Sequence, residues 1–326
     1  MPELKAIELL MVGRMLPMVG ETLERRFTLH RLVDQADPAA FLAAAGPRIC
    51  GLVSGPTSPV DKALIDRCPT LEIIANFGVG YDNVDAVHAG TRGIVVTNTP
   101  DVLTEEVADT ALGLMIMTVR ELGAAERHLR AGKWPDAPFP LTRASLRDRG
   151  VGIVGLGRIG KAIARRVEAF GMPVAYHNRN RLADVGYRYC ASLVELAKAV
   201  DILMVVTPGG AATRHLIDAD VLAALGPNGI LINVGRGSVV DEAALISALD
   251  AGTILSAGLD VFADEPRVPA ALIAHDRVTL LPHVASASQF TRNAMGQLVI
   301  DNLTGWFERG EVHTPVPEAM PKQWYL

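Results

Sequence analysis

Short apolar runs, each closed by glycine, proline or polar residues, recur along most of this chain. Runs of this kind, without strict alternation, are typical of strands buried on both faces of a parallel sheet. Between them, apolar positions recur at helical spacing, as at Ile159, Ile163, Val167 and Phe170. Strands that alternate with helices predict an α/β protein built on doubly wound parallel sheets. The predicted strands lie within residues 7–13, 49–55, 71–78, 94–98, 151–157, 174–178, 201–208, 229–235, 255–262 and 278–284.

Two helical patterns, in residues 102–122 and 286–309, are much longer than the helices predicted around them. We interpret them as the links between two domains. Residues 1–100 together with 288–326 would form a discontinuous first domain, and residues 101–287 a second, with a cleft between them. Periodicity alone leaves another interpretation open, in which one large sheet carries two long surface helices.

The composition indicates a protein whose partners are small molecules. Its 31 basic and 36 acidic residues are mixed along the chain, so no broad basic face is available for nucleic acid or an anionic membrane. The first apolar stretch is too short to span a membrane and lacks the features of a signal peptide. Cys50, Cys68 and Cys190 have neither metal-site spacing nor the density of a disulfide framework. We therefore expect a cytoplasmic protein without a metal.

A glycine motif marks the predicted cofactor site. Gly155, Gly157 and Gly160 have GxGxxG spacing between an apolar strand and an amphipathic helix, which is the context that gives this motif its meaning. The first glycine permits a tight turn, the second lets a pyrophosphate approach the backbone, and the third lets the helix pack on its strand. The helix N-terminus then presents free N–H groups to the phosphates. The alternative is a tight turn that binds no ligand.

The end of the next strand indicates which dinucleotide is bound. An Asp or Glu there would pair with the ribose hydroxyls of NAD, but this chain has Asn178 followed by Arg179 and Arg181. Guanidinium groups suit a phosphate dianion, so the segment favours NADP(H) over NAD(H). The alternative is that both arginines are ordinary solvated surface residues.

Polar residues that could carry chemistry follow three further predicted strands: Arg236, then Asp260 with Glu265, then His283. The carboxyl ends of parallel strands are where open α/β sheets bind ligands, so these residues could meet in one site. An arginine can grip a carboxylate, an imidazolium can donate a proton near neutral pH, and a carboxylate can orient that ring. Arg236, His283 and Glu265 fit these roles in the reduction of a 2-keto acid, although each alone could be structural.

At these residues the chain resembles the D-isomer-specific 2-hydroxyacid dehydrogenase family, and most closely its glyoxylate, hydroxypyruvate and hydroxyphenylpyruvate reductase branch. The resemblance covers nearly the whole chain, through FGVGYDNVD, TNTPDVLTEEVADTALGLM, GIVGLGRIG, LINVGRGSVVDE, AGLDVFADEP and LLPHVAS in their usual order. It implies a flavodoxin-like substrate domain and a dinucleotide-binding Rossmann domain joined by the two long helices. Formate dehydrogenases pair the histidine with an amide, so Glu265 argues against formate as the substrate.

The resemblance also implies roles for particular residues. Arg236, Glu265 and His283 form the catalytic set, and Arg236 and His283 also bind the substrate. The backbone N–H groups of Val79 and Gly80 bind its carboxylate. The residues implied in cofactor binding are Thr104, Gly155, Leu156, Gly157, Arg158, Ile159, Gly160, Asn178, Arg179, Arg181, Thr207, Pro208, Thr213, Val234, Gly235 and Asp260, the last facing the nicotinamide.

A homodimer paired through the cofactor domain is likewise implied by the resemblance. Trp134 falls in a segment that projects toward the partner subunit in this family. It could reach the partner's active site or serve only as an aromatic anchor at the dimer contact.

Two hypotheses for function come from different classes. The first is an NADPH-dependent reductase of glyoxylate, hydroxypyruvate or a related 2-keto acid. The second is a non-catalytic protein that senses dinucleotide on the same fold, since fold alone does not establish activity.

Overall fold

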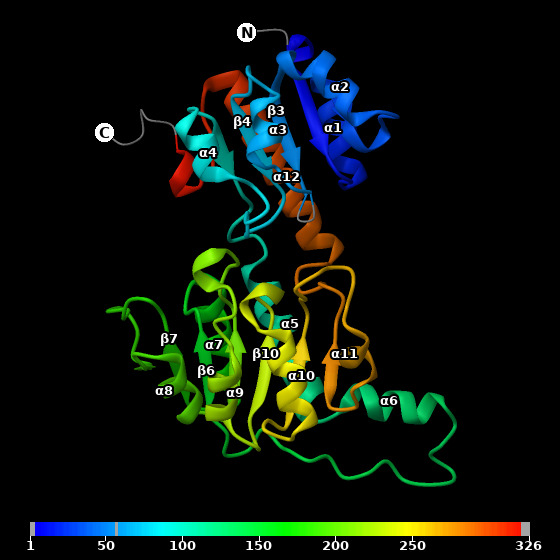
Figure 1. The fold of residues 1–326 in the computed structure, drawn as a ribbon, viewed down its shortest axis with the longest axis vertical. Helices are drawn as coiled ribbons and strands as arrows, with labels where there is room; N and C mark the ends of the chain where they lie inside the picture. The colour runs from blue at the N-terminus through cyan, green and yellow to red at the C-terminus, as the bar shows by residue number, and fades with distance from the viewer. Residues whose placement is uncertain (1–3, 56–57, 321–326) are drawn as a thin grey trace. The chain divides into compact units, whose positions relative to one another are not determined.

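The computed structural model describes residues 4–55 and 58–320. The chain forms two compact units, one of Met1–Leu103 with Ser288–Leu326 and the other of Thr104–Ala287 (Figure 1). We describe each unit by itself. Both are built on parallel sheets with helices, so the predicted α/β fold class is confirmed.

The first unit holds a five-stranded parallel sheet in the order β2-β1-β3-β4-β5 within its described residues. The C-terminal helix α12 packs against α1 and β4. The strands are β1 (Glu8–Val12), β2 (Thr28–Arg31), β3 (Ile49–Ser54), β4 (Ile73–Asn76) and β5 (Val95–Thr97). The helices are α1 (Pro17–Arg26), α2 (Pro38–Ala45), α3 (Lys62–Asp66), α4 (Ala86–Thr91) and α12 (Gln289–Arg309).

The chain after α12 lies along the β5 edge of this sheet. The N–H of Val316 donates to the carbonyl of Val96 at 2.9 Å, and Thr97 forms an antiparallel bridge with Pro315. Helix α12 itself begins where the Ser288 hydroxyl accepts a hydrogen bond from the N–H of Thr291. The last segment is therefore part of the first unit although the whole second unit precedes it in sequence.

The second unit holds a seven-stranded parallel sheet in the order β12-β11-β10-β9-β6-β7-β8 within the described chain. The order reverses between β6 and β9, and open sheets bind ligands at such a switch point. The strands are β6 (Val151–Val154), β7 (Val174–His177), β8 (Arg188–Tyr189), β9 (Ile202–Val205), β10 (Ile230–Asn233), β11 (Ser256–Leu259) and β12 (Val278–Leu280). The helices are α5 (Thr104–Val119), α6 (Leu122–Arg130), α7 (Arg158–Ala169), α8 (Leu193–Lys198), α9 (Ala219–Leu225), α10 (Glu242–Asp250) and α11 (Ala270–Ala274).

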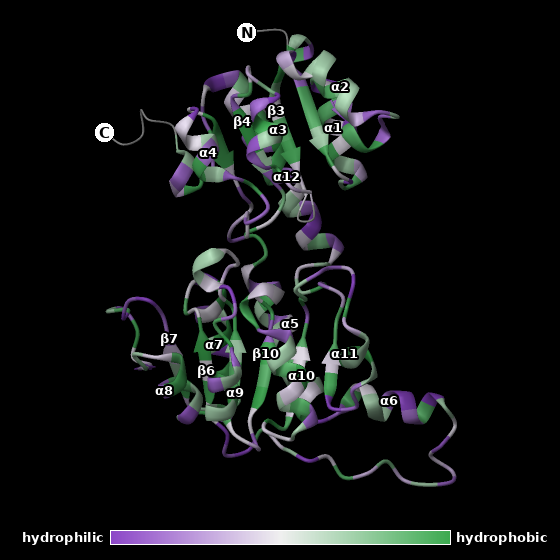
Figure 2. Cartoon of the chain, viewed as in Figure 1, coloured by the Kyte–Doolittle hydropathy of each residue, from purple (hydrophilic) through white to green (hydrophobic). Residues whose placement is uncertain are grey.

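Central strands supply the cores of both units, as their apolar runs predict. All residues of β4, β6, β9 and β10 are buried. In Figure 2, β10 is coloured hydrophobic along most of its length, whereas helices such as α6 mix hydrophilic and hydrophobic colours. The helix predicted from Ile159 onward is also present, but Phe170 caps its end and stays 51% exposed. No helix in the described part of the chain is long and apolar enough to cross a membrane.

Sequence patterns missed β2, β8 and nearly all of α6. Both strands lie at sheet edges, where a short polar run can pair on one side only and leaves no apolar signal. The helix predicted over residues 102–122 ends at Val119, and α6 begins separately after Glu121, whose φ of 51° is incompatible with a continuing helix. The predicted helix over residues 286–309 is the single helix α12.

Candidate active site

The glycine motif forms the turn from β6 into α7. Gly155 has a φ of +99°, which only glycine adopts readily, and a Cβ on Gly160 would lie 2.3 Å from the carbonyl oxygen of Gly155. Nothing lies within 4 Å of the position that a Cβ on Gly157 would take. Within the described residues, the N-cap position of α7 is Gly157, which makes no side-chain capping hydrogen bond. An open backbone at a helix N-terminus fits an anion such as a pyrophosphate.

Neighbouring strand ends hold this turn in place. The amide oxygen of Asn178, just after β7, accepts a hydrogen bond from the N–H of Leu156 at 2.7 Å. The hydroxyl of Thr207, after β9, donates to the carbonyl of Val154 at 3.0 Å. The turn therefore lies at the switch point between β6 and β9.

The two arginines after Asn178 have a different setting. Arg179 and Arg181 are exposed, and neither guanidinium forms a hydrogen bond or ion pair with any other described residue. Their charge is available to a ligand, because no acid in the described chain neutralises it.

Other predicted cofactor residues lie on adjoining loops. The hydroxyl of Thr213 donates to the carbonyl of Pro208 at 2.7 Å and closes the loop after β9. After β10, the N–H of Val234 donates to the carbonyl of Val205, and a Cβ on Gly235 would lie 2.7 Å from the carbonyl oxygen of Thr207. Thr104, Arg158 and Ile159 are on helices, Thr104 as the first residue of α5 and the other two in the first turn of α7.

Arg236 follows β10 between two glycines that pack against backbone. A Cβ on Gly237 would lie 1.8 Å from the backbone carbon of Phe262, so only glycine allows this approach. Asn233 braces the loop, since its amide donates to the carbonyl of Arg236 and its oxygen accepts from the N–H of Gly235, both at 3.0 Å. Sequence reasoning missed Asn233, although a polar residue at the end of an otherwise apolar strand was a usable signal.

His283 and Glu265 are in contact. The ring Nδ1 of His283 lies 2.7 Å from one carboxylate oxygen of Glu265, and the other oxygen accepts from the N–H of Phe262 at 2.9 Å. Burial alone raises the pKa of Glu265, but its hydrogen bonds and nearby positive charge outweigh burial and leave that pKa below its usual value. A carboxylate can only accept, so Nδ1 carries a proton and Nε2 is left for another partner.

Asp260 clamps the segment that carries His283. Its backbone carbonyl accepts from the N–H of His283, and its carboxylate oxygens accept from the N–H groups of Val284 and Ala285 at 2.8 and 3.0 Å. This clamp holds His283 at a φ of 54°. Burial raises the pKa of Asp260, against the lowering effect of the two backbone hydrogen bonds. Asp260 is fully buried, and its predicted contact with a cofactor stays a prediction.

Val79 and Gly80 lie in the loop after β4, half-buried, in the first unit, whereas Arg236, Glu265 and His283 belong to the second. The structure thus brings together the histidine and the glutamate within one unit. The carboxylate site predicted at Val79 and Gly80 is a separate feature of the other unit.

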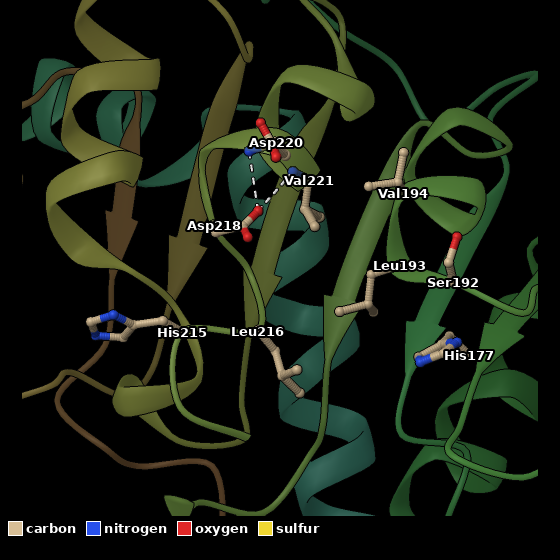
Figure 3. Close-up of a pocket in the computed structure, with 9 residues that line it drawn as sticks. All are labelled: His177, Ser192, Leu193, Val194, His215, Leu216, Asp218, Asp220 and Val221. Carbon is tan, nitrogen blue, oxygen red and sulfur yellow. Dashed lines mark hydrogen bonds between the residues drawn. The ribbon is translucent and has the colours of Figure 1, made fainter. Parts of the chain in front are cut away.

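A cavity of about 470 Å³ opens on the second unit near the end of β7 (Figure 3). It lies between the first turns of α8 and α9, where Asp218 caps α9 by accepting from the N–H groups of Asp220 and Val221. None of the predicted site residues lines it. The lining residues are His177, Ser192, Leu193, Val194, His215, Leu216, Asp218, Asp220 and Val221.

A doubly wound sheet with an open glycine turn at its switch point, together with a histidine–carboxylate pair after the carboxyl ends of β11 and β12 in the same sheet, defines the class of dinucleotide-dependent oxidoreductases. Residues 112–285 match the model for the D-isomer specific 2-hydroxyacid dehydrogenase, NAD binding domain. The chain belongs to the D-isomer specific 2-hydroxyacid dehydrogenase family.

Relatives match the chain over nearly its full length. It is 44% identical to a glyoxylate/hydroxypyruvate reductase A of Arabidopsis thaliana and 43% identical to a hydroxyphenylpyruvate reductase of Plectranthus scutellarioides, in each case over 96% of this chain and 100% of the relative. A solved structure from Sinorhizobium meliloti is 55% identical, with a TM-score of 0.93, over 97% of this chain and 98% of that one. That protein is an NADPH-dependent glyoxylate/hydroxypyruvate reductase in complex with NADP and malonate.

Proposed function

We propose that this protein reduces a small 2-keto acid, such as glyoxylate or hydroxypyruvate, to the 2-hydroxy acid at the expense of NADPH. The observation that carries the proposal is the pairing of His283 with Glu265 at 2.7 Å on a segment clamped by Asp260. This pair is a proton donor with its orienting carboxylate, and it occurs in a chain whose relatives are reductases of this kind.

Each residue has a distinct task in this reaction. The guanidinium of Arg236 binds the substrate carboxylate and polarises the adjacent carbonyl. His283 gives the proton from Nε2 to the carbonyl oxygen while Glu265 stabilises the charged ring. A bound reduced nicotinamide supplies the hydride that the carbonyl carbon accepts. The balance is one 2-keto acid, one hydride and one proton for each 2-hydroxy acid.

The second unit is the dinucleotide domain in this proposal, and the first is the substrate domain. Gly155, Gly157 and the first turn of α7 would hold the pyrophosphate, since the backbone is open at Gly157 and lies at a helix N-terminus. Arg179 and Arg181 would hold the 2′-phosphate that distinguishes NADP from NAD. Asn178 supports this preference, because it places no negative charge beside that phosphate.

We also propose a cytoplasmic homodimer. Large apolar side chains are exposed in α6 and the loop that follows, including Leu129, Trp134 at 66% and Leu141 at 97%. Exposed apolar side chains clustered in one segment are typical of a protein interface. Trp134 would anchor this contact. Cys50, Cys68 and Cys190 are free, which agrees with a reducing compartment.

Steady-state assays test the function directly. Initial rates with glyoxylate, hydroxypyruvate and hydroxyphenylpyruvate should be measured with NADPH and with NADH at matched concentrations. We expect turnover of at least one 2-keto acid and a higher kcat/KM with NADPH. Binding of dinucleotide without turnover of any 2-keto acid would contradict the proposal and favour a sensor on the same fold.

A further inference from the structure

In the loop after β4, the carbonyl groups of residues 78–80 accept hydrogen bonds from side chains elsewhere in the first unit. The side-chain amide of Asn76 donates to the carbonyl of Gly80 at 3.1 Å and to that of Gly78 at 3.4 Å. The amide of Asn98 donates to the carbonyl of Val79 at 2.8 Å. Three consecutive carbonyls therefore accept hydrogen bonds from two asparagine side chains.

Peptide geometry gives this arrangement a consequence for the N–H groups. In a trans peptide the C=O of one residue points opposite to the N–H of the next. Carbonyls of Gly78, Val79 and Gly80 that face the unit therefore direct the N–H groups of Val79, Gly80 and Tyr81 away from it. None of these three N–H groups has an acceptor among the described residues. Successive backbone N–H groups that are turned to the same side can form an anion site.

Asn76 suits this position because of what surrounds it. Its side chain is only 1% exposed, and its amide oxygen accepts a hydrogen bond at 3.0 Å from the hydroxyl of Ser54, itself fully buried. With the oxygen engaged, the NH₂ group is directed at the two carbonyls. A carboxylate of the same shape would place an oxygen against the carbonyls of Gly78 and Gly80 and would repel them.

We propose that Asn76 is a positioning residue for substrate binding, with Ser54 and Asn98 as its supports. It acts through the backbone by fixing the N–H groups of Val79 and Gly80 in the orientation that receives the substrate carboxylate. The inference rests on the proposed function, because it deepens the recognition of a 2-keto acid at the same loop. An oriented set of N–H groups binds an anion without the cost of reorganising the backbone.

Asn76→Asp tests the inference most directly, since it changes one group from donor to acceptor at nearly constant volume. We expect the KM for glyoxylate and hydroxypyruvate to rise about tenfold, in line with the loss of buried hydrogen bonds. The kcat and the KM for NADPH should stay within about twofold of wild type, because the lost interaction serves substrate binding uniformly. Asn98→Ala and Ser54→Ala should give smaller increases in the same KM.

Arg92→Ala is the matched control. Its guanidinium also donates to three backbone carbonyls of this unit, those of Ile65, Cys68 and Pro69, but at the turn that leads into β4 instead of the loop that leaves it. This variant should lower the Tm without raising the KM for either 2-keto acid. A purely structural role for Asn76 would make the two variants alike.

The outcomes that overturn the inference differ from those that overturn the proposed function. If wild type reduces glyoxylate while Asn76→Asp keeps its KM within about twofold, Asn76 does not position the site. Should Asn76→Asp not fold, unchanged KM values in both Asn98→Ala and Ser54→Ala would lead to the same conclusion. If wild type turns over no 2-keto acid, the proposed function fails, and the Kd of malonate, measured by calorimetry, then tests the inference. A higher Kd in Asn76→Asp would support it, and a Kd within about twofold of wild type would overturn it.

Discussion

The segment that carries His283 and the segment that carries Arg179 differ in how firmly the fold holds them. Around His283, the carboxylate oxygens of Glu265 and Asp260 all accept hydrogen bonds, from the histidine ring and from backbone N–H groups. After Asn178, by contrast, Arg179 and Arg181 are exposed and have no partner among the described residues.

This difference teaches which parts of a site need to be built in advance. Proton transfer depends on an orientation fixed within tenths of an ångström, so the imidazole is set before substrate arrives. Recognition of a phosphate dianion depends mainly on charge, and long flexible guanidinium groups can close on it after it binds. The segment that carries His283 should therefore control kcat, and the segment that carries Arg179 should control the affinity for the cofactor.

Removal of the imidazole should have the largest effect. We expect His283→Ala to lower kcat by about 10²- to 10⁴-fold, the usual contribution of a general acid, with little change in the Kd of NADPH. Stopped-flow and steady-state rates with glyoxylate measure the first quantity, and fluorescence titration measures the second. His313→Ala is the control, because that histidine is exposed. A kcat within about tenfold of wild type would exclude His283 as the proton donor.

Replacement of the Arg236 guanidinium should have the next largest effect on activity. Arg236→Lys keeps the charge but loses the planar fork that grips a carboxylate, so kcat/KM for glyoxylate should fall about 10- to 100-fold. Arg149→Lys, whose guanidinium donates to the carbonyl of Asn228, provides a control in the same unit. Equal kcat/KM values for Arg236→Lys and wild type would mean that a point charge suffices at this position. The close approach of Gly237 to the backbone of Phe262 would then serve a purpose other than placing a guanidinium.

The same contrast explains how much could be predicted from sequence. Apolar runs predict the strands β11 and β12 as well as the central ones. The carboxyl ends of β11 and β12 lie at the same side of the sheet, so the contact of Glu265 with His283 could be expected. The glycine spacing before α7 is equally informative, because each glycine answers a local steric need. The roles of these residues in catalysis and binding stay predictions.

Features that depend on backbone partners could not be predicted. The Asp260 carboxylate accepts from the N–H groups of Val284 and Ala285, and the Asn76 amide donates to the carbonyl of Gly80. One partner in each bond is a backbone group that every residue possesses, so no pattern of side chains marks where the bond forms. The break between α5 and α6 lies at Glu121, whose φ of 51° is a backbone property that no pattern of side chains marks.

Loss of a loosely held arginine should have a moderate and selective effect. We expect Arg179→Ala to raise the Kd of NADPH about tenfold while the Kd of NADH stays unchanged, since only NADPH carries the 2′-phosphate. Isothermal titration with both dinucleotides measures the difference. Arg188→Ala removes an exposed arginine of β8 from the same stretch and should leave both affinities as they are. Unchanged NADPH affinity in Arg179→Ala would refute the assignment of the phosphate site.

The smallest expected effect is on the thermal stability of a Glu265 variant and on its dependence on pH. It tests whether the segment that carries His283 is formed before any ligand binds. The pKa of Glu265 is lowered in the folded protein from 4.5, so its ionised form stabilises the fold above that pH and loses this contribution as pH falls through the lower folded value. Glu265→Gln should therefore lower the Tm by about 2–4 °C at neutral pH. The difference from wild type should shrink in acid below about pH 4.5, as scanning calorimetry across pH would measure. A Tm difference that stays constant down to strongly acidic pH would show that the carboxylate is not held in its charged form before ligands bind, and the contrast with Arg179 would then disappear.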